Sequence, residues 1–109
     1  MTMLSPGDIV AVDFPGVTGV KRRPAIVVST DEYHRHRPDV ILGIITSQVA
    51  DAVTPMDYVL QDWAIAGLHR ISAFRAFLET MPAASAKLIG HCSTRDWQEI
   101  QACLARAVA

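Results

Sequence analysis

The stretch PAIVVSTDEYHRHRPDVILGIIT, residues 24–46, contains two apolar runs separated by a polar segment. The first run, residues 24–30, is dense in β-branched side chains, which favour strands. The second run, residues 39–46, is almost continuously apolar, which is typical of a central strand. The polar segment 31–38 is short enough to be the turn of an antiparallel hairpin, so the sequence predicts two paired strands near the centre of a sheet.

A symmetric hairpin would bring Arg23 and Thr46 together. With pairing centred on the predicted turn, Thr30 lies opposite Asp39 and Arg23 lies opposite Thr46. Directly opposed residues share a face of the sheet, with Cβ atoms about 4.5–5.5 Å apart. Pro24 biases the backbone of Arg23 toward an extended conformation. A register slip of one residue would turn Thr46 to the other face of the sheet. The pattern predicts a guanidinium beside a hydroxyl; the alternative is an ordinary solvated basic turn.

The rest of the chain predicts further short strands. Residues 15–23, which include Gly16 and Gly19, are predicted to form a mobile loop. Residues 62–66 predict one or two helical turns that Gly67 stops. The additional strands are predicted at residues 8–14, 57–61, 72–78 and 88–90.

The C-terminal segment is the clearest helix. Ser93 is a predicted N-cap, and Asp96 is the carboxylate of a predicted capping box. Apolar residues then recur at helical spacing in one stripe: Trp97, Ile100, Leu104 and Val108. About five short strands with one terminal helix predict a mainly β fold with α, built as a strongly bent sheet or small barrel.

Length and composition limit the classes of protein. The 109 residues fit one domain, residues 1–109. The net charge of −1 gives no global attraction to nucleic acid, so such binding needs a local patch. Cys92 and Cys103 are predicted to be buried thiols, although a single bridge stays open. Residues 1–6 do not look like a signal peptide, and no apolar run approaches the ~20 residues of a membrane span, so we expect a soluble cytoplasmic protein.

Several motifs, taken in order, resemble the MazF/PemK (Kid) family of bacterial toxins. They are GDIV and VDF within residues 7–14, RPAIVVS at residues 23–29 and ITSQ at residues 45–48. The run DWAIAGL at residues 62–68, followed by Ser72 and Arg75, is similar to one branch of that family. No single motif is specific, but the ordered set extends over nearly the whole chain.

The resemblance implies a fold, an activity and partners. The implied fold is an SH3-like small barrel with a C-terminal helix, shared by MazF-like and CcdB-like toxins, and the implied assembly is a homodimer. The implied activity is cleavage of single-stranded RNA without a metal or other cofactor. In it the ribose 2′-hydroxyl attacks the adjacent phosphate, leaving a 2′,3′-cyclic phosphate and a 5′-hydroxyl. A cognate antitoxin would cover the RNA groove and neutralise the toxin, which otherwise inhibits translation and growth.

By position, Arg23 and Thr46 match the catalytic arginine and threonine of the family. A fixed arginine is a bidentate match for the phosphate oxygens on which charge develops. Thr46 is a poor base, so we expect it to position the transition state through a hydrogen bond. Arg75 matches a second arginine of some members and is expected to contact phosphate, because a guanidinium does not deprotonate. The expected RNA-binding residues are Lys21, Arg22, Ser47, Gln48 and Arg75.

The chain departs from the family where a general base is expected. The loop before Arg23 is short and has no carboxylate, and Phe77 stands where some relatives carry one. Glu79 is one candidate base. His69 is either a surface residue or a base that reaches the groove.

The remaining histidines and tryptophans have ordinary interpretations. His34 and His36 predict a solvated turn or a contact with RNA or a partner rather than a metal site, because no third ligand is near in sequence. His91 is expected to be structural. Trp97 is predicted to be a core residue, and Trp63 either a core residue or a platform for a base.

Two other functions stay open. A CcdB-like gyrase poison shares the implied fold but relies on an aromatic residue near its C-terminal end, which residues 104–109 lack. A non-catalytic barrel that binds RNA or a protein is favoured slightly by the missing carboxylates. Met56, Leu60 and the strand 39–46 are candidates for a dimer seam, because a small barrel rarely hides so much apolar area alone.

Overall fold

The computed structural model describes residues 3–16 and 19–108 of the chain. The strands are β1 (Asp8–Gly16), β2 (Gly19–Val27), β3 (Asp39–Thr46), β4 (Asp57–Val59), β5 (Ala73–Pro82) and β6 (Lys87–His91). The helices are α1 (Asp31–His36) and α2 (Thr94–Ala107), with short 3-10 turns η1 (Val49–Asp51) and η2 (Ala83–Ser85).

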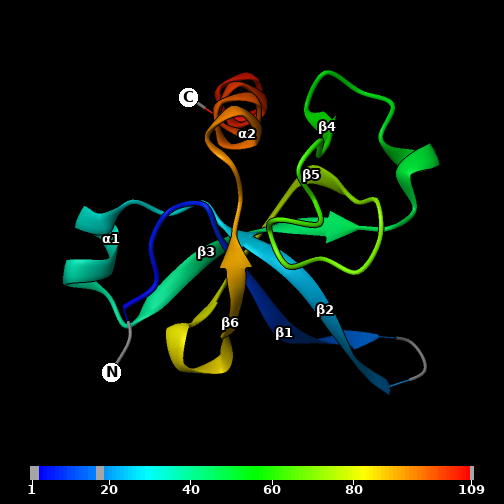
Figure 1. The fold of residues 1–109 in the computed structure, drawn as a ribbon. Helices are drawn as coiled ribbons and strands as arrows, with labels where there is room; N and C mark the ends of the chain where they lie inside the picture. The colour runs from blue at the N-terminus through cyan, green and yellow to red at the C-terminus, as the bar shows by residue number, and fades with distance from the viewer. Residues whose placement is uncertain (1–2, 17–18, 109) are drawn as a thin grey trace.

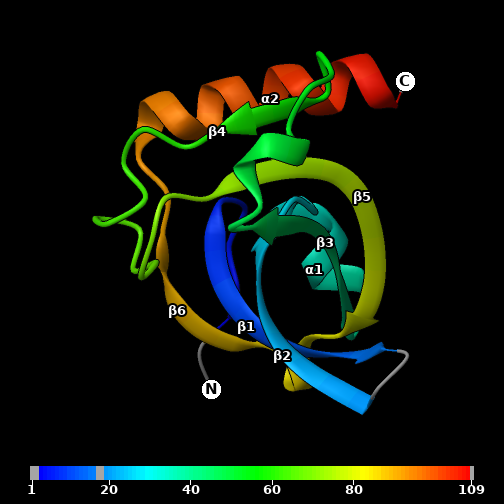
Figure 2. The ribbon, with the colours of Figure 1, turned by 90° about the vertical axis from the view of Figure 1, so that its right-hand side faces the viewer.

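The six strands form one antiparallel sheet in the order β4-β5-β3-β2-β1-β6. Figure 1 shows the β1–β2 hairpin projecting on the side away from α2. In Figure 2 the sheet curls round on itself and α2 lies across one end of the curl, beside β4. The predicted mainly β fold, a small barrel with a C-terminal helix, is confirmed. No helix within the described residues is long and apolar enough to cross a bilayer.

The pairing of β2 with β3 has the predicted register, but it stops earlier than predicted. Ala25 pairs with Ile44 and Val27 with Leu42, as a symmetric hairpin requires. Beyond Ala25 the strands change partners, because Arg23 pairs with Val12 of β1 and Thr46 with Ala73 of β5. Pro24 has no N–H to donate to β3, which accounts for the end of the ladder at this position.

The segment between β2 and β3 contains a helix that the sequence did not predict. Thr30 is its N-cap, and its Oγ1 accepts a hydrogen bond of 3.1 Å from the Tyr33 N–H. Thr30 therefore does not pair with Asp39, although the symmetric register predicts that it does. Asp39 instead accepts a hydrogen bond of 2.6 Å from the Tyr33 hydroxyl. A local cap, which favours helix over turn, overrides the symmetric hairpin at its tip.

The predicted mobile loop over residues 15–23 is largely wrong. β1 and β2 continue as a long hairpin in which Phe14 pairs with Lys21 and Gly16 pairs with Gly19. Only residues 17–18, which lie outside the described residues, connect the two strands. Gly19 has a φ of 121°, a conformation that glycine adopts without strain.

The core consists of two apolar clusters. One contains Ile9, Leu60, Phe74 and Ile100, and the other contains Val10 with residues of β2 and β3. The neighbours Ile9 and Val10 are both fully buried although they point to opposite faces of β1, so the sheet is covered on both sides there. The prediction of Leu60 in a dimer seam is wrong, because its side chain is buried in the core of its own chain.

The helix α2 covers the first cluster with the predicted stripe. Ile100 is fully buried, and Trp97 and Leu104 are half-buried against the cluster. Val108 is the exception, because it follows the end of α2 and is exposed. Trp63 also packs partly buried against this cluster, which favours its core interpretation.

The capping box predicted for α2 is half right. Ser93 is the N-cap, and its Oγ accepts a hydrogen bond of 3.2 Å from the Asp96 N–H. The Asp96 carboxylate does not return to Ser93. It accepts hydrogen bonds from the Tyr58 hydroxyl and from the N–H groups of Gln61 and Asp62, so it binds the segment after β4.

Cys92 and Cys103 are free and buried. Burial raises the pKa of both thiols, that of Cys92 to about 11. Both groups stay protonated at neutral pH, and the prediction of two buried thiols rather than a bridge is confirmed.

Candidate active site

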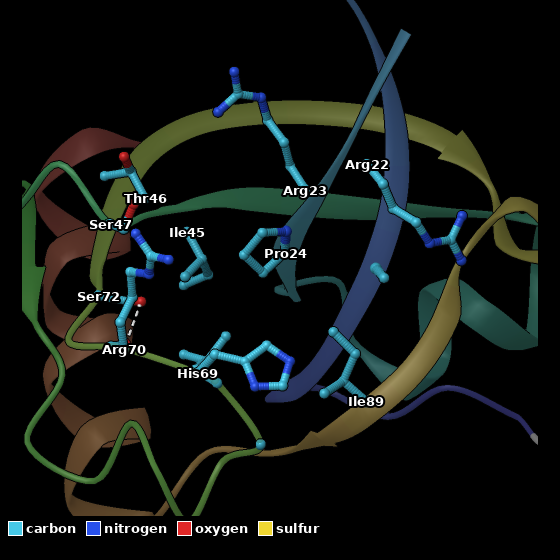
Figure 3. A pocket seen from close by; sticks show the side chains of 13 residues that line it. Arg22, Arg23, Pro24, Ile45, Thr46, Ser47, His69, Arg70, Ser72 and Ile89 are labelled. Atoms are coloured by element: carbon cyan, nitrogen blue, oxygen red, sulfur yellow. Dashed lines mark hydrogen bonds between the residues drawn. The ribbon is translucent and has the colours of Figure 1, made fainter.

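A cavity of about 530 Å³ opens where β2 and β3 part. Its walls come from β2, the end of β3, the segment before β5, and β6 (Figure 3). The lining residues are Ala11, Arg22, Arg23, Pro24, Ile45, Thr46, Ser47, Gly67, Leu68, His69, Arg70, Ser72 and Ile89. Four of them are basic and none is acidic, so a chain of nearly neutral net charge carries a local positive site.

Arg23 and Thr46 both line this cavity, although they are not the directly opposed pair that the hairpin predicts. Arg23 is exposed, and its guanidinium has no hydrogen-bond or ion-pair partner among the described residues. The Thr46 Oγ1 accepts a hydrogen bond of 3.1 Å from the Gln48 N–H, which fixes the oxygen and leaves the hydroxyl proton free to be donated. Figure 3 shows the two side chains along one rim of the cavity. The pair can therefore offer donors to an anion.

The other residues predicted to bind RNA divide into two groups. Arg22 and Ser47 line the cavity, although Arg22 also pairs with Asp13 at 3.1 Å. Lys21, Gln48 and Arg75 do not line it. Lys21 and Gln48 are exposed, and each is adjacent in sequence to a residue that lines the cavity.

Arg75 is held on β5 by its neighbours. Its Nε lies 3.5 Å from the Asp57 carboxylate, and its guanidinium lies 4.7 Å from the centroid of the Phe77 ring. Burial alone would raise the pKa of Asp57, but hydrogen bonds from Thr54 and the charge of Arg75 lower it overall. Arg75 is therefore partly neutralised within its own chain.

The segment between β4 and β5 supplies site residues, of which the sequence indicated only His69, as one of two alternatives. It places His69, Arg70 and Ser72 in the cavity wall. Gly67 begins this stretch with a φ of 95°, and the buried Leu68 donates its N–H to Trp63 O at 3.1 Å. The DWAIAGL motif marks the start of this segment. The path of the segment across the barrel depends on partners that are distant in sequence.

These distant partners are the first residues of α2. Asp62 receives two hydrogen bonds from Arg95, of 2.7 and 2.8 Å, and one of 2.6 Å from the Ser93 hydroxyl. The hydrogen bonds from Arg95 and Ser93 lower the pKa of Asp62 to about 2. Asp96 binds the same segment, and burial together with the Asp96 carboxylate raises the pKa of Tyr58. The segment that carries His69 is therefore fastened to α2.

The chain matches a known protein family over nearly its whole length. The family model for the PemK-like, MazF-like toxin of type II toxin-antitoxin systems matches residues 5–108. The chain belongs to this family. The resemblance seen in the ordered motifs is thereby confirmed.

The toxin also has the fold of solved MazF structures. An endoribonuclease in complex with its cognate antitoxin from a mycobacterial species aligns with a TM-score of 0.76 and 19% identity over 95% of this chain and 93% of that one. MazE-MazF from Deinococcus radiodurans aligns with a TM-score of 0.77 and 18% identity over 97% and 96%. The Mycobacterium tuberculosis toxin MazF-mt6 aligns with a TM-score of 0.73 and 17% identity over 92% and 94%. No curated protein sequence matches the chain.

The other histidines of the toxin lie outside the cavity. His34 Nε2 shares a hydrogen bond of 2.6 Å with the Ser29 hydroxyl, and His36 is exposed on α1. His91 Nδ1 lies 2.8 Å from the Asp8 carboxylate, across the β1–β6 pair, in the structural role expected for it. Within residues 3–16 and 19–108, no three histidine, cysteine or acidic side chains gather as metal ligands would.

The two acidic positions considered for a base also lie elsewhere. Glu79 is exposed on β5 opposite Leu42, and Phe77 is exposed on the same strand. Neither lines the cavity. The site thus offers donors and positive charge without a carboxylate.

Proposed function

We propose that this toxin is a metal-independent endoribonuclease that cleaves single-stranded RNA by attack of a ribose 2′-hydroxyl on the adjacent phosphate. The products are a 2′,3′-cyclic phosphate and a 5′-hydroxyl end. The observation that carries the proposal is that one cavity is lined by Arg23, whose guanidinium has no partner among the described residues, and by Thr46, whose hydroxyl proton is free to be donated. Family membership supports it, because the solved structures of the same fold include proteins described as endoribonucleases.

Arg23 and Thr46 act on the charge that develops during the reaction. As the new P–O bond forms, negative charge grows on the two non-bridging oxygens of the phosphate. The planar fork of Arg23 can donate two hydrogen bonds to these oxygens, and the Thr46 hydroxyl can donate a third. A preorganised donor of this kind is worth roughly 10²–10³ in rate.

The proposed RNA path follows the positive charge around the cavity. Arg22 lies beside Arg23 at one wall and Arg70 comes from another, while Ser47 adds a hydroxyl next to Thr46. Lys21, Gln48 and Arg75 stay predicted RNA contacts outside the cavity, which an RNA longer than one nucleotide would reach.

The proposal includes partners and a cellular place. One solved neighbour is described as an endoribonuclease in complex with its cognate antitoxin and another as MazE-MazF, and we propose that an antitoxin covers the cavity of this toxin. We further propose that residues 1–109 form one toxin domain that works in the cytoplasm as a homodimer and inhibits growth by cleaving mRNA.

The proposed activity is tested by incubating the purified protein with a long RNA in EDTA and mapping the new ends. Cuts that leave cyclic phosphates and 5′-hydroxyls support the proposal. Arg23→Ala should abolish most cleavage, whereas Arg35→Ala, an exposed arginine on α1 outside the cavity, should cleave as the wild type does. Intact RNA with wild-type protein would overturn the proposal and leave the non-catalytic binding barrel as the better interpretation.

A further inference from the structure

The cavity wall contains a single imidazole side chain. The ionisable residues in its wall are three arginines and His69. A guanidinium keeps its proton at any pH that the fold survives. Histidine is the side chain that ordinarily changes its charge between about pH 5 and 8. Only His69, among the residues that line the site, has the chemistry of a general base.

His69 is held in place from both sides while its ring stays free. On one side the buried Leu68 is bonded to Trp63, and on the other the buried Ser72 donates its hydroxyl to Arg70 O at 2.9 Å. The imidazole has no hydrogen-bond partner among the described residues. Figure 3 shows the ring reaching into the cavity, below Pro24 and beside Ile89. A fixed backbone, together with a ring that makes no hydrogen bond to the described residues, suits a side chain that takes a proton from a bound substrate.

We infer that His69 is the general base of the toxin, a role that rests on the proposed endoribonuclease activity. An unprotonated ring nitrogen of His69 takes the proton of the 2′-hydroxyl as the O2′–P bond forms. The P–O5′ bond breaks, and its electron pair stays on the 5′-oxygen, which takes a proton from water. The imidazolium then gives its proton to the hydroxide left by that water, so the enzyme returns to its starting state.

This assignment divides the work of the site among three residues. Arg23 and Thr46 meet the charge on the phosphate, and His69 removes the proton that they cannot accept. The other charged groups that line the cavity are the guanidiniums of Arg22 and Arg23 from β2 and of Arg70 from the same segment as His69, and none of the described residues that line it is acidic. A histidine that only contacted a base would contribute to binding but would not set the pH dependence of the chemical step.

The test is the pH dependence of cleavage of a short single-stranded RNA, taken from the mapped cut site, between about pH 5 and 8. We expect wild-type kcat to rise with pH and then level off. His69→Gln should lose roughly 10²–10⁴ in kcat together with this rise. His36→Gln, an exposed histidine outside the cavity, should match the wild type. Added imidazole should restore activity to His69→Ala but not to Arg23→Ala, which a structural role of His69 would not predict.

A substrate with sulfur in place of the 5′-oxygen separates the base from an acid. Its leaving group needs no proton, so the deficit of His69→Gln should persist if His69 is the base. A deficit that disappears with this substrate would make His69 the acid and overturn the inference.

The two proposals fail in different ways. RNA left intact by the wild type would refute the endoribonuclease itself. Wild-type cleavage that Arg23→Ala impairs, but that His69→Gln leaves unchanged in rate and pH profile, would refute the role of His69 alone.

Discussion

Asp62 and Arg95 form a two-pronged ion pair that fastens the segment between β4 and β5 to the first turn of α2. The Nε–Oδ2 and Nη2–Oδ1 distances are 2.7 and 2.8 Å. The Ser93 hydroxyl completes the cluster at 2.6 Å. Because this segment carries His69 and Arg70 into the cavity wall, a contact between residues outside the cavity holds part of that wall in place.

We predict that Asp62→Asn lowers the free energy of unfolding at pH 7, since it weakens the charged hydrogen bonds from Arg95 and Ser93. The folded-state pKa of Asp62, about 2, lies below its ordinary value. The carboxylate therefore stabilises the fold above about pH 4, and this contribution is lost as the pH falls toward 2. Urea unfolding should show a wild-type advantage that shrinks over this range.

The control for this change is Asp51→Asn, because the Asp51 side chain is exposed and makes no hydrogen bond to a described residue. It should be as stable as the wild type at both ends of the pH range. Equal stability of Asp62→Asn and Asp51→Asn at pH 7 would show that the ion pair does not hold the segment.

Asp96 is predicted to be the stronger anchor of the same segment. Its side chain is fully buried and accepts hydrogen bonds of 2.6, 3.1 and 2.8 Å from Tyr58, Gln61 and Asp62. Asp96→Asn replaces one acceptor oxygen with an amide NH2 group that faces donors, so it should lower the free energy of unfolding by about 1–3 kcal/mol. Glu99→Gln, an exposed change on the same helix, should have no effect in thermal unfolding. A stable Asp96→Asn protein would argue against the three-bond arrangement.

Arg23 and Thr46 should matter for cleavage and not for folding. Arg23→Ala and Thr46→Val are each expected to lose roughly 10²–10³ in kcat, because each removes a donor aimed at the transition state. Arg23→Lys should recover only part of the loss, since an ammonium cannot form the bidentate contact. In cells, Arg23→Ala and Thr46→Ala should relieve growth inhibition while the protein stays folded by circular dichroism. Full toxicity with both substitutions would exclude this pair as the site.

The sequence predicted the parts of the site that depend on local strand pattern. The strand over residues 39–46 has the predicted bounds, and the symmetric pairing of β2 with β3 is observed from Ala25 to Val27. That pairing correctly brought Arg23 and Thr46 to one place, although the two strands separate before reaching them. The separation of the strands is explained by Pro24, which has no N–H with which to continue the ladder.

The contribution of His69 and Arg70 could not be derived in the same way. They lie in irregular chain whose course is fixed by bonds between Asp62 and Arg95 and between Gln61 and Asp96. Such side-chain contacts between residues far apart in sequence leave no periodic pattern. The helix α1 was missed for the opposite reason, because a local cap at Thr30 outweighed the hairpin symmetry.

Gly90 gives a last prediction, on the contact between β6 and the segment before β5. A Cβ atom at Gly90 would lie 2.3 Å from Ala66 O, so only glycine lets the two backbones approach this closely. Gly90→Ala should push the segment outward, lower the free energy of unfolding by about 1–3 kcal/mol and reduce kcat by displacing His69. Lys87→Ala, an exposed change on the same strand, should leave both quantities unchanged in parallel unfolding and cleavage assays. A Gly90→Ala protein with wild-type stability and activity would mean that β6 does not press on the segment that carries His69.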